Sequence, residues 1–301
     1  MKYLFLFFIM SLTPLAVLSQ QQPDTTFSFT IENPRYVGGS GPTICIDSAH
    51  NNFHTLEGGF SPFSRVVQED GYKVIDSNQS ITSVQLEACD IYIIVNPLHE
   101  SNIGNWTLPN PSAFTKQEIL ELGEWVDSGG KFFLIADHMP FAGAAYDLGK
   151  SFGIEFSNGF ATLEKEQNQP DVFSFENNRL KESPITGGGI LSVTSFTGSA
   201  FTYPEDAIPV MVFKEGDYSL EPDVAWQFEE NIKTVQLDGY AQGVLLEIGE
   251  GRAAIFGEAA MFTAQVINQG TENEFRVGIN NTGLAPQNLE FLLNLIHWLD
   301  E

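Results

Sequence analysis

The chain has 301 residues, 43% of them hydrophobic and 18% charged, so it can bury a large core and is not a disordered chain. The 39 acidic residues outnumber the 14 basic ones and give a formal net charge of −25. This charge makes binding to the phosphates of nucleic acid electrostatically unfavourable. We therefore expect no nucleic-acid partner.

The first 19 residues differ from the rest of the chain. Lys2 is followed by the apolar run "YLFLFFIMSLTPLAVL", and the small residues Val17 and Ser19 suit cleavage directly after Ser19. An uncleaved anchor helix is the alternative, but Pro14 interrupts the run and polar residues follow it. The pattern predicts a signal peptide at 1–19, export to the periplasm or the extracellular space, and a polar leader at 20–40. No later stretch approaches the roughly 18 apolar residues of a membrane span, so we expect no transmembrane segment in the mature chain.

From residue 41 to about 155, short apolar runs alternate with segments of helical periodicity. Strands are predicted at 43–47, 72–76, 90–98 and 131–137. Helices are predicted at 61–71, at 115–128 behind the capping-box pair Thr115 and Glu118, and over "GAAYDLGKSFG". Strands that alternate with helices predict an α/β fold with a doubly wound, mostly parallel sheet.

The segment from about 155 to 240 is turn-rich and weakly periodic. It predicts a β-rich insertion laid over one end of the sheet, within a single α/β domain at 41–301. The α/β pattern then returns, because "GVLLEIGEGRAAIFGEAAMF" reads as two strands joined by the turn "GEG". A closing helix is predicted at 286–299, where His297 lies among apolar residues at helical spacing and is expected to be structural.

The chain has two cysteines, Cys45 and Cys89, which lie in or beside predicted core strands. We expect two buried thiols, with a disulfide between neighbouring strands as the alternative in an exported protein. No Cys-x-x-Cys pair is present, so the sequence indicates no cysteine-based zinc site.

Polar side chains follow the predicted strands repeatedly, and four of the five histidines are among them. The carboxyl ends of parallel strands meet at one edge of such a sheet, where ligands bind. We therefore predict a polar pocket at this edge with three catalytic residues: Asp137, His138 and Glu258. The expected ligand-binding residues are Asp47, His50, Asn51, Asn52, His54, His99, Glu100 and Phe141.

Two kinds of chemistry agree with this composition. Imidazole nitrogen and carboxylate oxygen bind transition metals, so a divalent metal held by His50, His54 and His138 is one hypothesis. The other is a metal-free site, with Glu258 or Asp137 as base and His138 as acid. A zincin peptidase is excluded, because "HNNFH" lacks the glutamate of the His-Glu-x-x-His motif. Each residue alone also suits a cap or a turn, but the gathering of imidazoles at one edge favours a pocket.

Several of these segments resemble the class I glutamine amidotransferase-like superfamily, which has a flavodoxin-like fold, and within it a branch related to ThuA-like proteins. The resemblance is carried by "ICIDSAHNNFHT", "PFSRVVQEDGYKV", "LEACDIYIIVNPL", "WVDSGGKFFLIADHMPFAGAA" and "GRAAIFGEAAMFTAQ". It implies the fold more than the reaction. The nucleophilic cysteine of the superfamily is missing, because "FFLIAD" runs into "HMPFAGAA". We therefore expect neither a glutamine amidotransferase nor a cysteine peptidase.

Two functions remain as hypotheses. The first is an exported protein that binds or hydrolyses a small polyol or glycan-type ligand, a class implied by the resemblance to sugar-utilisation proteins. Phe53, Phe60 and Phe141 are the aromatic residues expected to cover a sugar face. The second is a non-catalytic binding or interaction module of a cell-envelope assembly, which the missing cysteine supports.

Overall fold

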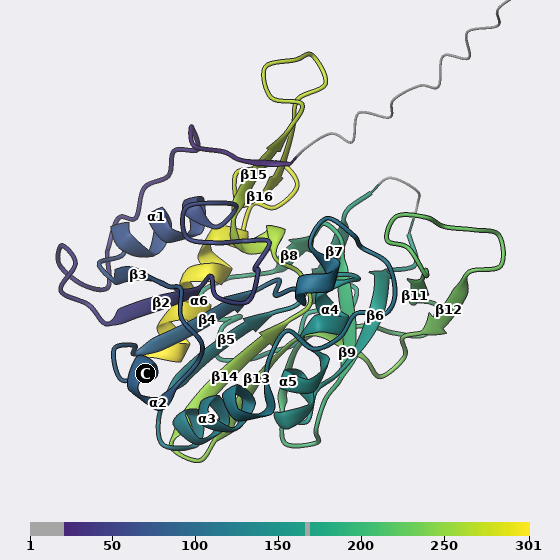
Figure 1. Cartoon of the computed structure of the whole chain (residues 1–301). Helices are drawn as coiled ribbons and strands as arrows, with labels where there is room; N and C mark the ends of the chain where they lie inside the picture. Colours follow the sequence, from purple (N-terminus) through teal and green to yellow (C-terminus); the bar gives the residue numbers. More distant parts are fainter. Residues whose placement is uncertain (1–20, 166–168) are drawn as a thin grey trace, which may run out of the picture.

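The structure is a computed structural model that describes residues 21–165 and 169–301 (Figure 1). The predicted signal peptide and its cleavage site lie outside the described residues. Within the polar leader, a short strand, β1 (Gln22–Pro23), pairs with a strand near the C-terminus. Among the described residues, no helix combines the length and the apolar character that crossing a bilayer requires.

The described residues form one large sheet of eleven strands, and β10 branches from it by pairing with β13. The other strands follow the order β12-β11-β6-β9-β13-β14-β5-β4-β2-β3. The first five strands in chain order are β2 (Thr43–Asp47), β3 (Lys73–Ser77), β4 (Ile91–Val95), β5 (Lys131–Ile135) and β6 (Glu155–Thr162). The remaining six are β9 (Gly198–Thr202), β10 (Ile208–Val212), β11 (Tyr218–Glu221), β12 (Lys233–Gln236), β13 (Ala241–Ile248) and β14 (Gly251–Phe256).

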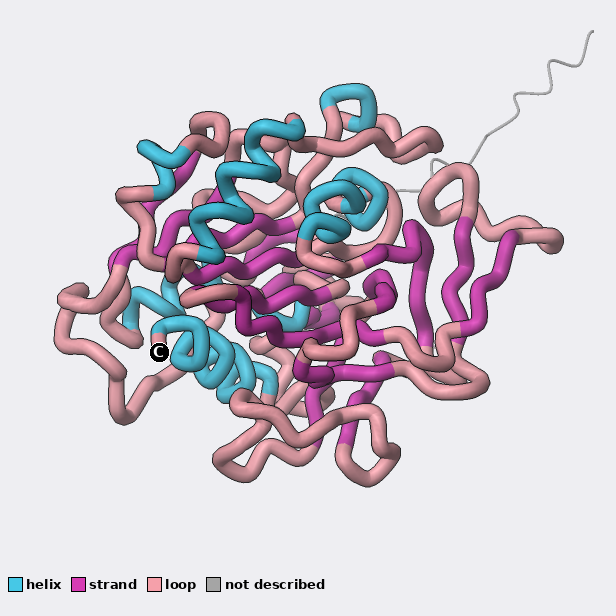
Figure 2. The backbone as a smooth tube through the Cα atoms, turned by 90° about the horizontal axis from the view of Figure 1, so that it is seen from below, coloured by secondary structure: helices cyan, strands magenta, loops and turns pink. Residues whose placement is uncertain are grey.

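Half of this sheet is parallel and has helices on both faces (Figure 2). Its order, β3-β2-β4-β5-β14, is the 2-1-3-4-5 order of flavodoxin-like folds. The helices α1 (Ser61–Glu69) and α6 (Asn288–Asp300) pack on one face, and α2 (Ser83–Leu86), α3 (Lys116–Asp127), α4 (Phe141–Ala144) and α5 (Tyr146–Ser151) lie toward the other. Ile93 and Ile94 of β4 point to opposite faces and are both buried, as expected for a strand that is covered twice.

The other half of the sheet is antiparallel, which corrects the prediction of a mostly parallel sheet. The tight turn between β13 and β14 reverses the chain, because so short a connection can join only antiparallel neighbours. The strands β9, β6, β11 and β12 then continue the sheet by antiparallel pairing. The 155–240 segment therefore lengthens the sheet at one end, at the right of Figure 1, rather than lying only over it.

Two smaller sheets and two short 3-10 helices complete the described chain. The strands β7 (Asp171–Ser174) and β8 (Ser192–Ser195) pair with each other, and β1 joins β15 (Ala264–Ile267) and β16 (Phe275–Gly278). The 3-10 helices are η1 (Glu100–Asn102) and η2 (Ala260–Phe262). Both follow strands of the parallel half and lie in the loops that build the polar edge.

The two cysteines form a disulfide, which corrects the expectation of two buried thiols. Cys45 lies in β2 and Cys89 precedes β4, its parallel neighbour, with 5.7 Å between the two Cα atoms. This separation is typical of bridged cysteines. Within the described residues no free cysteine remains, so neither cysteine is a thiol nucleophile.

Local sequence signals place the helix that later matters for the site. Thr115 and Glu118 form the predicted capping box of α3, in which each side chain bonds the backbone N–H of the other. At the far end of the chain, His297 of α6 lies 2.6 Å from Asp70 through Nε2, so its predicted structural role is confirmed.

Candidate functional site

The carboxyl edge of the parallel strands carries a row of polar side chains. The strands β2, β4, β5 and β14 lead respectively into Asp47, Asn96, Asp137 and Glu258. Asn96 has a positive φ of 50° and its Oδ1 accepts the backbone N–H of Asp137 at 2.9 Å, which ties two adjacent loops together. The strand order reverses between β2 and β4, so this edge is where a flavodoxin-like sheet binds its ligands.

Asp137 and Glu258 form a buried carboxyl pair at this edge. Asp137 Oδ1 accepts the N–H of His138 at 2.7 Å, and the two Glu258 oxygens accept the N–H groups of Ala260 and Met261 at 2.7 and 2.8 Å. Burial, and then repulsion from Asp137, raises the pKa of Glu258 well above its ordinary value. Burial also raises the pKa of Asp137, although the neighbouring His138 opposes this. Burial and mutual repulsion therefore both disfavour the doubly ionised form of the pair.

His138 lies beside this pair and has one defined ring contact. Its Nδ1 is 2.7 Å from the carbonyl oxygen of Met139, and since a carbonyl only accepts, Nδ1 carries the hydrogen. In the neutral ring, Nε2 is then the acceptor. The ring stacks on Phe160 at a centroid distance of 4.4 Å and an interplanar angle of 14°. His138 is therefore held by an aromatic neighbour and oriented by a backbone carbonyl.

Around His138 lies a group of aromatic side chains from five separate segments, which we call the aromatic cluster: Phe53, Trp106, His138, Phe141, Phe160, Trp226 and Phe228. Trp226 contacts both His138 and Phe160, with centroid distances of 4.8 and 4.7 Å. The outer members keep much of their surface in solvent, because Phe53 is 48%, Trp226 49% and Phe228 46% exposed. A contiguous exposed aromatic surface of this kind indicates a binding site.

Two loops that are distant in the sequence hold the rim of this cluster. The loop after β4 carries Trp106, and the loop between β11 and β12 carries Trp226 and Phe228. They are joined through the backbone, since Ala225 N–H donates to the Trp106 carbonyl and Leu108 N–H donates to the Asp223 carbonyl, both at 2.9 Å. The rim is thus fixed by hydrogen bonds rather than formed by free loop ends.

Trp226 has an unusual backbone conformation at the centre of the rim. Its φ is 67°, in the left-handed region that bulky residues rarely adopt. Such a conformation costs of order 1 to 3 kcal/mol and is found most often at functional sites. The fold therefore holds a half-exposed tryptophan in a strained position beside His138.

His50, predicted to bind a ligand or a metal, is instead a structural residue. Its Nδ1 lies 2.8 Å from Asp47 Oδ2 and its Nε2 lies 3.1 Å from Glu118 Oε1, so a carboxylate occupies each ring nitrogen. Burial opposes protonation, but the bonds to Asp47 and then Glu118 outweigh it and raise the pKa of His50. Glu118 is the capping-box residue of α3, and Tyr92 also donates to Asp47. This network joins β2 to α3.

The other predicted residues of the first loop bond mainly to the backbone. Asn52 Oδ1 accepts the N–H of His50 at 3.1 Å, and Asn51 Nδ2 donates to the Leu98 carbonyl at 3.2 Å. Asn51 also has a φ of 49°, which agrees with a turn residue. These contacts favour a loop-stabilising role for both asparagines.

His54 and His99 differ in burial, because His54 is buried and His99 is half-buried. His54 is buried against Phe53 and Phe60, and burial, followed by repulsion from His138, lowers its pKa to about 4. Its Nδ1 has no hydrogen-bond partner among the described residues. His99 bonds Ser101 at 2.8 Å through Nδ1, and Glu100 beside it is exposed. Neither His99 nor Glu100 joins the carboxyl pair.

The predicted three-histidine metal set is not assembled. Both His50 nitrogens face carboxylates, and His138 Nδ1 faces a carbonyl. In the part of the chain that the structure describes, no group of three or more His, Cys, Asp or Glu side chains is placed to hold a metal ion.

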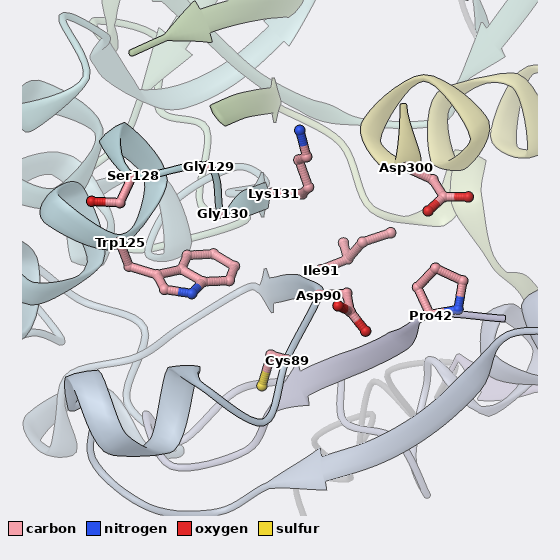
Figure 3. A pocket seen from close by; sticks show the side chains of 10 residues that line it. All are labelled: Pro42, Cys89, Asp90, Ile91, Trp125, Ser128, Gly129, Gly130, Lys131 and Asp300. Carbon is pink, nitrogen blue, oxygen red and sulfur yellow. The ribbon is translucent and has the colours of Figure 1, made fainter. Parts of the chain in front are cut away.

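A hollow of about 340 Å³ lies at the opposite edge, by the amino ends of β2, β4 and β5 (Figure 3). Lys131, Asp90 and Asp300 surround it. Asp90 accepts the N–H of Thr43 at 2.7 Å, and Asp300 accepts from Arg35 and Tyr72 at 3.0 and 3.1 Å. These carboxylates already stabilise strand and leader contacts, so the carboxyl edge remains the better candidate site.

Sequence reasoning found Phe53, His138 and Phe141 but missed the other four members of the aromatic cluster. Phe60, predicted with them, is buried and stacks on Phe63 at 4.8 Å, so it belongs to the core. The missed signal is present in "GNWTLP" and "VAWQFE", where tryptophan and phenylalanine occur in turn-rich segments without helical or strand periodicity. Neither helical nor strand spacing places aromatic residues in such loops on a buried face, so they are candidates for a binding surface.

Comparisons with known proteins bear on the fold alone. No protein-family model and no curated protein matches this sequence. Among solved structures, the mmIFT52 N-terminal domain matches with a TM-score of 0.59 and 15% identity, over 86% of this chain and 97% of that chain. Cytoplasmic protein STM1381 from Salmonella typhimurium LT2 matches with a TM-score of 0.52 and 11% identity, over 86% and 99%. At such identities the likeness establishes a shared α/β architecture and nothing of the reaction.

A thua-like protein from Bacteroides uniformis ATCC 8492 is also similar, with 13% identity over 90% of this chain and 94% of that chain. Its TM-score is 0.46. The two matches with TM-scores above 0.5 agree with the α/β fold expected from the sequence, and the ThuA-like and amidotransferase-like resemblance stays a prediction.

Proposed function

We propose that this protein binds a small polyol or glycan-type ligand on the aromatic cluster at the carboxyl edge of the sheet. The observation that carries the proposal is the exposed aromatic surface of Phe53, Trp226 and Phe228, which surrounds the imidazole of His138. A sugar ring has an apolar face of C–H bonds that packs on aromatic rings, and its hydroxyls need a few polar partners. His138 Nε2 supplies a hydrogen-bond acceptor within this surface.

The charge of the protein supports a neutral ligand. The net charge of −25 disfavours phosphorylated or other anionic ligands. The net charge would attract a cationic ligand, but burial disfavours the ionised forms of Asp137 and Glu258 beside His138. Hydroxyl-rich neutral compounds remain the best match.

Hydrolysis of such a ligand is a second candidate, favoured by the raised pKa of the carboxyl pair beside His138. A protonated carboxyl is suited to donate a proton to a leaving group. His138 Nε2, with Nδ1–H held by the Met139 carbonyl, is suited to activate water as a base. This assignment exchanges the roles predicted from the sequence, in which a carboxylate was the base and His138 the acid.

The binding proposal is tested with a panel of neutral glycans and polyols titrated into the purified protein, followed by tryptophan fluorescence and calorimetry. Trp106 and Trp226 lie in the cluster and should report binding directly. We expect Phe228→Ala to weaken binding about fivefold or more, since a stacked aromatic contact is worth about 1 kcal/mol or more. Phe275→Ala is the matched control, because Phe275 is also exposed, at 43%, but lies on β16. Equal affinities of the two variants would contradict the proposal.

Hydrolysis is tested separately with Asp137→Asn and His138→Gln. If the carboxyl pair is the acid, Asp137→Asn should abolish turnover while ligand binding on the outer aromatic residues is retained. A wild-type protein that binds a glycan but never cleaves it would leave the non-catalytic binding module as the function. Capture of a cell-envelope protein at the same surface, blocked by Phe228→Ala and not by glycan, would instead favour the interaction module.

Export belongs to the same proposal. The disulfide between Cys45 and Cys89 supports folding in an oxidising compartment, as the signal-peptide pattern predicts. Expression of the full chain in a host with a secretory pathway should yield a mature protein that begins near Gln20. Mass spectrometry of the exported fraction measures this directly, and an uncleaved protein in the membrane fraction would contradict it.

A further inference from the structure

A polar groove of about 480 Å³ continues the candidate site beyond the aromatic cluster. Its walls come from the loop before α3, from α4 and α5, from β6, and from the paired strands β11 and β12. The residues that matter for its chemistry are Asn110, Gly143, Tyr146, Asn158 and Glu221.

The groove and the aromatic cluster share four chain segments, so they are neighbouring parts of one surface. On β6, Asn158 lines the groove and Phe160, two residues later, stacks on His138. On α4, Gly143 lines the groove and Phe141 belongs to the cluster. The loop before α3 runs from Trp106 in the cluster to Asn110 in the groove, and Asn110 Nδ2 donates to the Thr107 carbonyl at 3.0 Å. The fourth segment runs from Glu221 at the end of β11 to Trp226 and Phe228.

The groove presents uncharged hydrogen-bonding groups in a fixed arrangement. Asn158 Nδ2 donates to Asn110 Oδ1 at 2.8 Å, and Asn158 Oδ1 accepts the N–H of Gly143 at 2.9 Å. An amide has two donor hydrogens and two acceptor lone pairs, so these bonds leave Asn158 one donor and one acceptor for a ligand. Tyr146 adds an aromatic ring with a hydroxyl group.

Two of the charged side chains in the groove are paired with each other, and the carboxylate of Asp147 also lines it. Glu221 accepts the hydroxyl of Ser157 at 2.7 Å and forms an ion pair with Lys233. A carboxylate paired in this way still accepts a hydroxyl hydrogen, but it attracts a free cation less. Amides, a phenol and a paired carboxylate together suit the hydroxyl groups of a neutral sugar.

We propose that this groove is a second sugar subsite, and that the ligand is therefore an oligosaccharide that crosses from the groove to the aromatic cluster. One unit stacks on the cluster, and the adjoining unit hydrogen-bonds to Asn158 and Glu221 and packs on Tyr146. This inference rests on the proposed function, because it assigns the second unit of the same ligand. It also explains why the apolar and the polar parts of the surface are built from the same four segments.

Gly143 gives a direct way to close the groove without touching the aromatic cluster. A Cβ atom at this position would lie 2.7 Å from Asn110 Cβ and 2.8 Å from Asn158 Nδ2. Gly143→Ala must therefore displace the asparagine pair from its present position. The matched control is Gly123→Ala, since Gly123 is also helical and a Cβ there meets nothing within 4 Å.

The experiment measures affinity against chain length by calorimetry. The probes are linear β-1,4-linked glucose, xylose, mannose and N-acetylglucosamine oligomers and α-1,4-linked glucose oligomers, each from one to six units. For the wild type and Gly123→Ala, we expect one series to gain at least tenfold in affinity when the second unit is added. Gly143→Ala should lose most of that gain and keep the affinity for the single unit. Tyr146→Ala, which removes a wall of the groove without crowding it, should act in the same direction.

The outcomes separate this inference from the proposed function. A single unit that binds as tightly as the longer oligomers, with Phe228→Ala weakening both, would overturn the second subsite and leave the aromatic site in place. An undiminished chain-length gain in both Gly143→Ala and Tyr146→Ala would overturn it as well. Absence of binding by every probe to the wild type would count against the aromatic site itself, and the groove would fall with it.

Discussion

His50 and His138 both follow strands of the parallel half, and both are nearly buried, yet their surroundings are opposite. His50 has a carboxylate on each ring nitrogen and links β2 to α3. His138 has a backbone carbonyl at one ring nitrogen and an aromatic ring stacked on its face. Beside it lie two carboxyl groups, Asp137 and Glu258, that repel each other. The first arrangement satisfies every charge that it buries. The second leaves a ring nitrogen and exposed aromatic surface for another molecule, which is why only the second is a candidate for function.

The difference between His50 and His138 should be largest in the stability of their variants. His50→Gln leaves Asp47 and Glu118 buried without their cation, so we expect the free energy of unfolding to fall by about 3 to 5 kcal/mol. His138→Gln leaves no buried charge unpaired and removes one stacked ring, so we expect a loss of only about 1 kcal/mol. Urea denaturation of both variants measures the difference, with His99→Gln as a half-exposed control expected within about 0.5 kcal/mol of the wild type. Similar losses for His50 and His138 would remove the distinction.

The contribution of His50 to the free energy of unfolding should change with pH in a defined direction. The pKa of His50 is raised above 6.5 in the folded state, so its contribution is fully present below pH 6.5 and is lost as the pH rises through the raised value. The pKa of Glu118 is lowered, mainly by its bonds to Thr115 against an opposing effect of burial, so its contribution is lost as the pH falls through that value. The stability gap between wild type and His50→Gln should therefore be widest between these two limits.

A smaller effect is expected from the carboxyl pair. Both carboxyl groups have raised pKa values, so their contribution to stability is present at low pH and is lost as the pH rises above their unfolded values. Asp137→Asn removes one charge and keeps the acceptor for the His138 N–H. We expect the variant to lose less stability than the wild type as the pH rises above the unfolded values of the two groups, as measured by urea unfolding at several pH values. Parallel curves would mean that the two carboxyl groups do not interact.

A still smaller effect on stability is expected from the backbone conformation of Trp226. A left-handed backbone is strained for any residue with a Cβ atom and is free for glycine. Trp226→Gly and Trp226→Ala remove nearly the same side-chain contacts, so we expect the glycine variant to be more stable by about 1 kcal/mol. Both should lose binding to the same extent. A more stable alanine variant would show that Trp226 is not strained in solution.

The least invasive test titrates the histidines of the unaltered protein by NMR. The ring signals of His54 should change only near pH 4, because burial and the neighbouring His138 lower its pKa to about 4. Those of His50 should change above pH 6.5, because its two carboxylate partners raise its pKa. A His54 signal that titrates near pH 6.5 would indicate that its loop admits water.

The parallel half of the fold could be predicted from the sequence, whereas the antiparallel half could not. Continuous apolar runs such as "DIYIIVNPL" require cover on both faces, and helices of matching periodicity follow them. The 155–240 strands are short and interrupted by glycine and turn residues, so their periodicity does not reveal which strand pairs with which. The disulfide stayed an alternative for the same reason, since pairing of Cys45 with Cys89 depends on the adjacency of β2 and β4.

The sequence by itself determined that polar and imidazole side chains gather at one edge, because strand ends in a parallel sheet share an edge whatever residues follow them. Only the tertiary structure decided which of them are partners. Glu118 is 68 residues from His50, and Trp226 is 88 residues from His138, so no local spacing links them. Strand order and register set these distances, and they made one histidine a structural link between β2 and α3 and placed the other within an aromatic surface.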